Sequence, residues 1–211
     1  MADLKRGICA VISAGRISDI QWLKKGCEDC DTVICADGGY RYARAAEIKA
    51  DAVVGDFDSG EAPQDENVTV FPVRKDDTDT ALAIESGISL GYRRFKVFGA
   101  VSGARLDHTA ASITLCAKYA LQGISITLFD EKNEITVLVP GVYELENSGK
   151  KLSLFAFGES VEGLCEKGVG YSLENYTLSP FDPLCVSNEI VCEKAVISFK
   201  SGVLLVIRST D

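Results

Sequence analysis

The chain has 211 residues, of which 46% are apolar and 25% charged, and its formal net charge is -9. This composition is typical of a globular protein with a buried core and excludes a largely disordered chain. The negative charge argues against a nucleic-acid surface, because phosphate backbones are bound by clustered Lys and Arg. No stretch approaches the roughly 20 apolar residues of a membrane span, and the N-terminus lacks the apolar run of a signal peptide, so we expect a cytoplasmic protein.

The first two-thirds of the sequence alternates short β-branched runs with helical patterns, which is typical of βα units around a parallel sheet. The predicted strands are residues 8–12, 33–36, 52–54, 68–71, 96–98 and 125–129. The predicted helices are residues 17–25, 40–46, 78–90 and 107–121. The third of these helices has the clearest apolar stripe, and Thr78 is placed to cap its first turn.

From about Asn133 the pattern changes to short alternating strands that are broken by Gly, Asn and Pro. The strands predicted there are residues 135–139, 142–145, 151–157, 195–199 and 203–208. We expect two domains, 1–132 and 133–211, joined at residues 131–134. The expected fold class is α/β, an open and mostly parallel sheet with flanking helices, followed by a small antiparallel β-sandwich.

The eight cysteines lie mostly within apolar runs, where Cys behaves as a small hydrophobe, so we interpret them as reduced thiols. Cys27 and Cys30 form a CxxC pair. A zinc site with four protein ligands needs a second pair, and the only histidine, His108, lies far away in the sequence. A chance spacing near a helix end is therefore the simpler interpretation of this pair.

Charged and polar residues, together with glycine, gather directly after the predicted strands of the parallel sheet. They are Asp37 and Gly38 after the second strand, Asp56 and Asp58 after the third, Lys75, Asp76, Asp77, Thr78 and Asp79 after the fourth, and Arg105, Asp107 and His108 after the fifth. Open parallel sheets bind ligands beyond the carboxyl ends of their strands. The sequence therefore predicts one acidic crevice at this edge of the sheet.

So many carboxylates repel one another unless cations lie among them, which favours a bound divalent metal. Mg2+ prefers oxygen ligands and is usually held by one or two carboxylates together with substrate phosphates. We therefore expect Asp56, Asp58, Asp76 and Asp79 to supply a partial cage. The helix N-termini at Thr78 and Asp107 offer N–H groups to phosphate oxygens, and Lys75 and Arg105 would neutralise phosphate charge.

Each motif taken alone has a simpler structural interpretation. Asp and Gly are common turn formers and helix caps, and Asp77 can be a solvated side chain. A lone histidine at a helix start, such as His108, is more often a packing residue than a catalyst. Arg105 can equally be a salt-bridge partner in so acidic a place. The co-location of these residues at successive strand ends is what favours a phosphate-binding site.

Four motifs resemble, in order and spacing, those of thiamine pyrophosphokinases. They are ADGG at 36–39, GDFDS at 55–59, KDDTD at 75–79 and GARLDH at 103–108. The resemblance continues through residues 168–173, Leu178 and the SNE sequence at 187–189, so it covers nearly the whole chain. The chain departs from the family pattern at Ala104, where a second Gly is usual, and at Gly170 and Ser172, which replace the Lys and Pro of a GLKYPL segment.

The resemblance implies transfer of the pyrophosphoryl group of ATP to the hydroxyl of thiamine, with Mg2+ as cofactor and AMP as the leaving product. It also implies a homodimer whose active sites lie between the α/β domain of one subunit and the sandwich of the other. The site residues that it implies are Asp56, Asp58, Asp76, Asp79 and Arg105 for catalysis, Asp37, Gly38, Lys75, Thr78, Asp107 and His108 for the nucleotide, and Ser187 and Asn188 for thiamine.

The residues themselves leave two rival functions open. One is a metal-dependent phosphohydrolase or nucleotidyltransferase that uses the same carboxylates on another substrate. The other is a silent protein that binds thiamine or nucleotide, although such a binder has no need of Lys75 and Arg105 beside the aspartates. A P-loop kinase is excluded, because no GxxxxGK sequence followed by Ser or Thr occurs.

Overall fold

A computed structural model describes residues 7–55, 69–71, 78–101 and 105–210 of the chain. The chain divides into two compact units. The first comprises Met1–Leu115 with Gly123–Glu131, and the second comprises Cys116–Gln122 with Lys132–Asp211. Within the described residues, no helix is long and apolar enough to cross a membrane.

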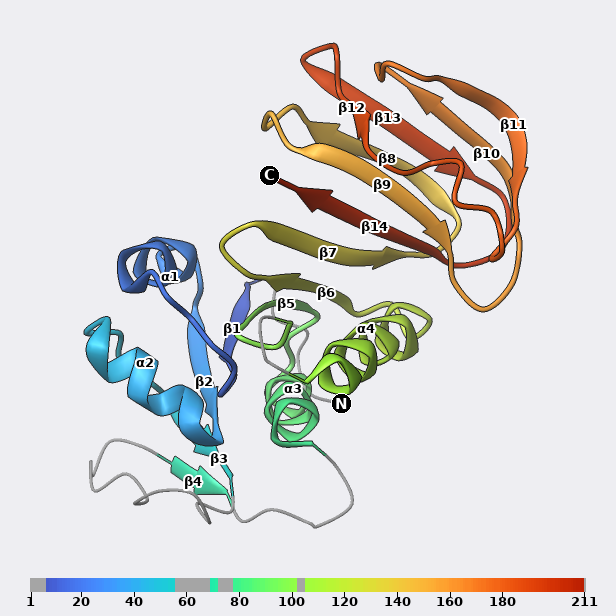
Figure 1. Cartoon of the computed structure of the whole chain (residues 1–211). Coiled ribbons are helices and arrows are strands. Elements are labelled where there is room, and N and C mark those ends of the chain that lie inside the picture. The colour runs from blue at the N-terminus through green and yellow to red at the C-terminus, as the bar shows by residue number, and fades with distance from the viewer. Residues whose placement is uncertain (1–6, 56–68, 72–77, 102–104, 211) are drawn as a thin grey trace. The chain divides into compact units, whose positions relative to one another are not determined.

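The first unit is built on a parallel sheet with the strand order β6-β5-β1-β2-β3-β4 (Figure 1). Its strands are β1 (Cys9–Ile12), β2 (Thr32–Ala36), β3 (Ala52–Val54), β4 (Thr69–Phe71), β5 (Arg94–Phe98) and β6 (Ser125–Phe129). Its helices are α1 (Ile20–Cys27), α2 (Tyr40–Ala45), α3 (Asp79–Ser89), the short 3-10 helix η1 (Asp37–Gly39) and α4 (Leu106–Ala120), whose residues from Cys116 onward are grouped with the second unit. β1 and β2 are almost entirely buried, as expected for central strands covered on both faces.

Helices cover both faces of this sheet, with α1 and α2 on one side and α3 and α4 on the other (Figure 1). The alternation of side chains along β1 explains how. Ala10 and Ile12 join the apolar cluster that contains Leu23 of α1, whereas Cys9 faces the other way, against Gly87 of α3. A Cβ atom at Gly87 would lie 2.5 Å from the ring of Phe95, so only glycine lets α3 approach the strands this closely.

The strand order reverses at β1. The chain proceeds outward through β2, β3 and β4 and then returns to β5, on the other side of β1. The segments that follow β1 and β5 are hydrogen-bonded together, since Ser13 N donates to Phe98 O at 2.8 Å and Gly15 N donates to Gly99 O at 3.0 Å. A reversal of this kind leaves a crevice beyond the carboxyl ends of the strands, where α/β proteins bind ligands.

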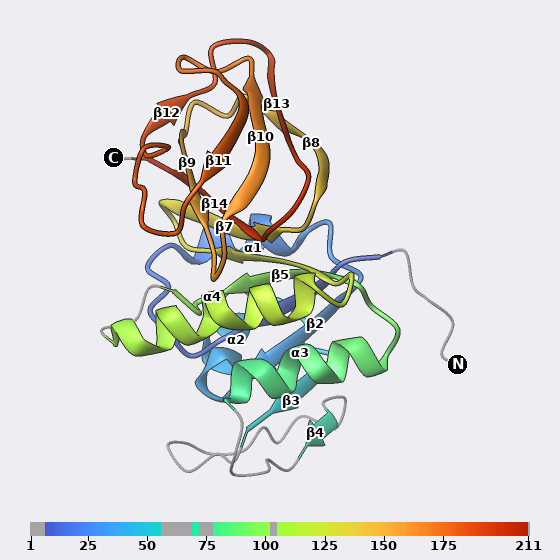
Figure 2. The ribbon, with the colours of Figure 1, turned by 90° about the vertical axis from the view of Figure 1, so that its right-hand side faces the viewer.

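The second unit contains antiparallel strands in two sheets, with orders β12-β9-β14-β7 and β11-β10-β13-β8 (Figure 2). The strands are β7 (Asn133–Leu138), β8 (Gly141–Glu146), β9 (Lys151–Ala156), β10 (Val161–Lys167), β11 (Leu173–Leu178), β12 (Asn188–Glu189), β13 (Lys194–Phe199) and β14 (Leu204–Ser209). Alternate residues such as Leu154, Leu164 and Ile197 are fully buried and form one apolar core.

The predicted fold class, an α/β sheet followed by a small antiparallel sandwich, is confirmed. All predicted helices and strands exist, with ends that differ by a few residues; α1, for example, starts at Ile20 because Asp19 caps it. The prediction missed β10, β11 and β12. These segments are rich in charged and polar residues, and pairing within the sandwich outweighs their weak strand propensity.

Candidate functional site

The segment that follows β2 places a strained aspartate at the carboxyl edge of the parallel sheet. Asp37 has a φ of 42°, in the left-handed region that non-glycine residues seldom occupy. Gly55, which directly follows β3, packs against Asp37. A Cβ atom at Gly55 would lie 2.9 Å from the Asp37 Cα. Gly38 lies against Ala14, in the segment after β1. The ends of β1, β2 and β3 therefore meet around Asp37 and Gly38.

The beginning of α3 brings two more of the predicted residues to the edge of the parallel sheet. Thr78 caps the helix, because its hydroxyl accepts a hydrogen bond from Ala81 N at 3.2 Å, which confirms the predicted cap. Asp79 lies in the first turn and is half-buried. Thr80 shares a hydrogen bond of 2.9 Å with the buried hydroxyl of Ser13. This bond ties the start of α3 to the segment after β1.

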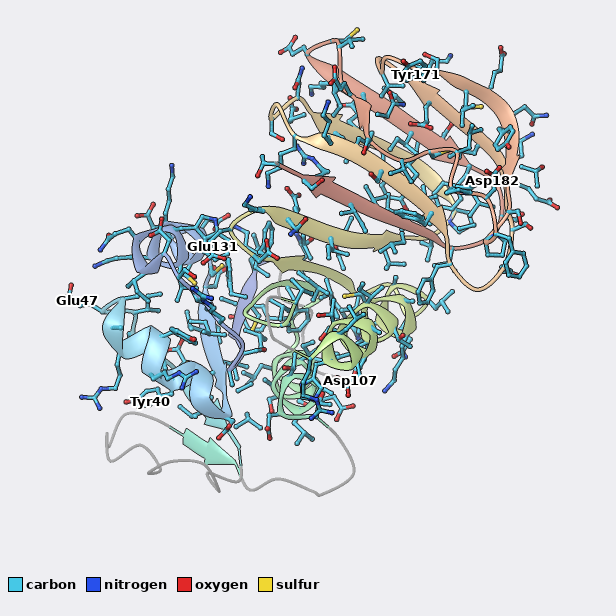
Figure 3. All side chains as sticks on the ribbon, viewed as in Figure 1. Tyr40, Glu47, Asp107, Glu131, Tyr171 and Asp182 are labelled. Carbon is cyan, nitrogen blue, oxygen red and sulfur yellow. The ribbon has the colours of Figure 1, made fainter. Side chains whose placement is uncertain are left out.

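Arg105 and Asp107 form an ion pair at the start of α4, where Figure 3 labels Asp107. The Arg105 Nε lies 3.2 Å from Oδ1 of Asp107, and a second guanidinium nitrogen contacts Oδ2. This hydrogen-bonded pairing lowers the pKa of Asp107 and raises that of Arg105. Both side chains are exposed, so the guanidinium is charged and accessible. His108 is also exposed, and its backbone N donates to Asp107 Oδ1 at 3.1 Å.

The other predicted residues of the acidic crevice lie outside the described residues. They are Asp56, Asp58, Lys75, Asp76 and Asp77, together with the family departure at Ala104. Within the part of the chain that the structure describes, no group of three or more His, Cys, Asp or Glu side chains is placed to hold a metal ion. Asp79 is the one predicted metal ligand among the described residues.

In the sandwich, the side chain of Asn188 is buried and holds the backbone of Tyr171. Its Oδ1 accepts from Tyr171 N at 3.1 Å and from Glu189 N at 2.9 Å. Its Nδ2 donates to Tyr171 O at 3.0 Å and lies 3.5 Å from Oε2 of Glu166. An Asn amide has two donor hydrogens and two acceptor lone pairs. All of them are used within the chain.

Tyr171 is 82% exposed and lies in the loop between β10 and β11 (Figure 3). Its neighbour Gly170 lies beside the exposed side chain of Val191, so this part of the sandwich offers an apolar surface on a fixed backbone. Ser187, adjacent to Asn188, has a φ of 59°, and its N–H donates to the hydroxyl of Ser153 at 3.0 Å. The predicted thiamine residues thus lie next to an exposed aromatic ring.

Sequence reasoning missed Ser13, Arg41 and Glu166. Ser13 and Ala14 directly follow a predicted strand, so the rule applied to the other strand ends identifies them as well. Arg41 donates to Ala14 O at 3.2 Å and adds an exposed cation near the carboxyl edge. The sequence does not indicate that Glu166 is buried, because the neighbouring residues do not predict a buried strand there.

The first unit has the fold of an α/β enzyme of the class that acts on phosphorylated substrates, and the carboxyl edge of its sheet carries features that suit such a ligand. The strand reversal at β1, the helix N-termini behind Thr78 and Asp107 and the exposed Arg105 and Arg41 are the features that suit phosphate groups.

Known proteins with the same sequence patterns and fold identify the enzyme further. Residues 23–128 match the family model of the thiamin pyrophosphokinase catalytic domain, and residues 142–204 match that of the thiamin pyrophosphokinase vitamin B1 binding domain. The thiamine pyrophosphokinase of Bacillus subtilis (strain 168) is 32% identical in an alignment of 166 residues, and the match covers 74% of this chain and 77% of the relative.

Solved structures agree with these matches. The thiamine pyrophosphokinase structure from Bacillus subtilis superposes with a TM-score of 0.85 at 28% identity, over 97% of this chain and 99% of that one. The structure from Geobacillus thermodenitrificans gives 0.84 at 28% identity, over 97% and 98%. The chain belongs to the thiamine pyrophosphokinase family, whose known reaction is the transfer of a pyrophosphoryl group from ATP to thiamine. It is therefore an enzyme, with ATP as its co-substrate.

Proposed function

We propose that the α/β domain, residues 1–132, binds ATP and carries out the transfer, and that the sandwich, residues 133–211, binds thiamine. The observation that carries this division is the anchored, exposed Tyr171 beside Asn188, within the segment similar to a vitamin B1 binding domain. An aminopyrimidine needs an apolar wall and a polar partner. The exposed Tyr171 offers a ring face and a hydroxyl, whereas the Asn188 amide is already used within the chain. The described basic residues suited to phosphate lie in the other unit.

On the nucleotide side, we assign ATP binding to Asp37, Gly38, Lys75, Thr78, Asp107 and His108, with Arg105 as the group that stabilises phosphate charge. Arg105 supports this assignment because it is exposed and held by Asp107 in a defined orientation. When phosphate charge builds up, a guanidinium positioned in this way stabilises it without reorganising. The protein's contribution to such a transfer is mainly positioning and charge stabilisation.

For the metal, we assign Asp56, Asp58, Asp76 and Asp79 as the residues that would hold Mg2+. The donor set fits, since carboxylate oxygens are the ligands that Mg2+ prefers. Two described features support the grouping: Gly55, which precedes Asp56, packs on Asp37, and Asp79 begins α3 at the same edge of the sheet. When bound, the ion would neutralise charge on the phosphates of ATP.

We also propose a homodimer in the cytoplasm. Tyr171, Phe181, Leu184 and Val191 are large apolar side chains exposed on the second unit, and a subunit interface would cover such residues. All eight cysteines are free thiols, which suits a reducing compartment. Sedimentation of the purified protein tests the dimer: a single monomeric species at working concentration would rule it out.

The assignment of ATP to the α/β domain and of thiamine to the sandwich is tested by measuring the KM for each substrate in variants of each domain. Tyr171→Ala should raise the KM for thiamine and leave the KM for ATP unchanged, whereas Arg105→Ala should lower kcat or raise the KM for ATP. A matched control is Tyr176→Ala on β11, since Tyr176 is paired with Asp182 and not with Asn188. The reverse pattern, with Tyr171→Ala acting on ATP alone, would show that the two domains have been assigned the wrong way round.

A further inference from the structure

Glu166 on β10 is a carboxyl group inside the sandwich, with only 1% of its surface exposed. Its partners across the sheet are Leu173 on β11 and Ile197 on β13. Leu164, two residues earlier on the same face of β10, is fully buried in the apolar core. Burying a carboxyl among such neighbours is unfavourable unless it is hydrogen-bonded, so its presence calls for an explanation.

The only side-chain amide bonded to this carboxyl among the described residues belongs to Asn188. Oε2 of Glu166 lies 3.5 Å from Nδ2 of Asn188, and the Cys185 thiol lies beside the same group. Oε1 is buried and has no hydrogen-bond partner within the described chain. A carboxylate only accepts hydrogen bonds, so it requires the NH2 end of the Asn188 amide to face it.

That orientation determines which atoms of the Asn188 amide form hydrogen bonds with the backbone of Tyr171. With Nδ2 turned toward Glu166, Oδ1 faces the N–H groups of Tyr171 and Glu189, as observed. An amide flipped by half a turn would set its NH2 against those N–H groups, donor against donor. Glu166, Asn188 and Tyr171 therefore form a chain of fixed contacts that runs from the sandwich interior to an exposed aromatic ring.

We propose that Glu166 is a positioning residue for thiamine, acting through Asn188 to fix the backbone that presents Tyr171. This inference rests on the proposed function, in which the sandwich binds thiamine. Glu166 does not touch the substrate, because its carboxyl is enclosed. Its effect should therefore be confined to thiamine affinity and should leave ATP affinity unchanged.

The protonation state of Glu166 provides a readout that a purely structural role would lack. Burial raises the pKa of Glu166 to about 7, while the bonds from Asn188 and Cys185 act in the opposite direction. Among the residues that the structure describes, the titratable group that faces Glu166 is Cys185. The strand partners of Glu166 are apolar, and the nearby Glu189–Lys151 pair is solvent-exposed. An ionised carboxylate accepts more strongly than a neutral acid, so the Asn188 contact should tighten as pH rises through about 7. The KM for thiamine should fall over this range.

The test measures KM for thiamine and for ATP between about pH 5.5 and pH 8.5 in the full-length enzyme, with thermal melting as a check of folding. Glu166→Leu removes the acceptor and should raise the KM for thiamine by about fivefold at the alkaline end, the effect of one lost hydrogen bond. Glu166→Gln keeps an acceptor oxygen and should lose the pH dependence. Glu162→Gln, on the exposed side of β10, is the matched control and should behave as the wild type.

A folded Glu166→Leu enzyme with the wild-type KM for thiamine would overturn the proposal, as would a Glu166→Gln enzyme that keeps the wild-type pH dependence. If neither variant folds, the wild-type profile decides: a fall in KM for thiamine through about pH 7 that ATP does not share supports the proposal, and a flat profile overturns it. Failure of the proposed function is recognised separately, because Tyr171→Ala would then leave the KM for thiamine unchanged or act on the KM for ATP alone.

Discussion

The side chain of Asn188 makes two hydrogen bonds to the backbone of Tyr171, accepting from its N–H at 3.1 Å and donating to its carbonyl at 3.0 Å. The two residues are 17 positions apart in the chain. The Asn188 amide thus pairs with the N–H and the carbonyl of one residue, as the backbone of a neighbouring strand does in an antiparallel sheet. It leaves the Tyr171 ring exposed while its backbone is fixed.

Replacing Asn188 by Ala should therefore affect both stability and thiamine use. The backbone groups of Tyr171 and the N–H of Glu189 lose partners, which should reduce the free energy of unfolding by about 1 to 3 kcal/mol. The KM for thiamine should rise by about fivefold or more, and the KM for ATP should not change. Urea unfolding and steady-state kinetics measure the two effects.

A matched control for this variant is Tyr143→Phe. The Tyr143 hydroxyl donates to the backbone carbonyl of Val139 at 2.7 Å, and β8 lies at the opposite edge of its sheet from β11. This substitution should destabilise the sandwich without changing the KM for thiamine. If both variants raise that KM equally, the effect comes from general loosening and Asn188 has no special role.

Asp79→Asn tests the proposed metal site, since Asp79 is the one predicted metal ligand that the structure describes. The side chain lies in the first turn of α3 and is not part of the apolar core, so the fold should persist and relieved repulsion should slightly favour it. Turnover should fall by about a hundredfold or more, the usual effect of removing a group that stabilises charge in the transition state. Near-normal AMP formation at saturating magnesium would contradict the assignment. Glu85→Gln, further along the same helix, serves as the control.

Titration of the buried Glu166 carboxyl should make the free energy of unfolding depend on pH. Its folded pKa of about 7 lies above the usual 4.5, so its contribution to stability is complete below about pH 4.5 and is lost as pH rises through about 7. The loss should amount to at most about 3 kcal/mol. Glu166→Gln should therefore gain stability relative to the wild type between about pH 5 and pH 8 in urea unfolding. A constant difference across that range would show that the group does not titrate there.

The eight cysteines should titrate as free thiols in the denatured protein. In the native protein, the exposed Cys192 should react first with a thiol reagent, and Cys192→Ser should remove the fast phase. The buried thiols should react slowly, since burial raises the pKa of Cys35 to about 12. Recovery of a stable disulfide between Cys27 and Cys30 would overturn the interpretation of that pair as a chance spacing.

The predictable parts of this fold are those in which local and tertiary preferences agree. α3 could be located from its apolar stripe and from the cap at Thr78, because the cap bond joins residues only three positions apart. The grouping of the aspartates at one edge stays a prediction, which follows because every parallel strand ends there; the structure describes Asp37, Asp79 and Asp107 of this group. β10 and β11 could not be found, since charged and polar residues interrupt their apolar ones. The pairing of Glu166 with Leu173 and Ile197 is a contact between distant positions, which the local pattern does not show.

The candidate site shows the same limit. The motif containing Ser187 and Asn188 could be identified by its similarity to a known family, which suggested that the Asn188 amide is available to a ligand. The structure instead uses all the hydrogen-bonding capacity of that amide within the chain. Contacts between positions far apart in the sequence determine this arrangement, and a single sequence does not reveal them.

The most direct test of the account is the formation of AMP as thiamine and ATP are titrated in the presence of magnesium. We predict that AMP and thiamine diphosphate appear in equal amounts, that both require thiamine, and that chelation of the metal abolishes both. Release of AMP at the same rate without thiamine would contradict the account and favour a phosphohydrolase. Tight binding of thiamine and ATP without any AMP would contradict it in the other direction, since the chain would then be a binding protein and not an enzyme.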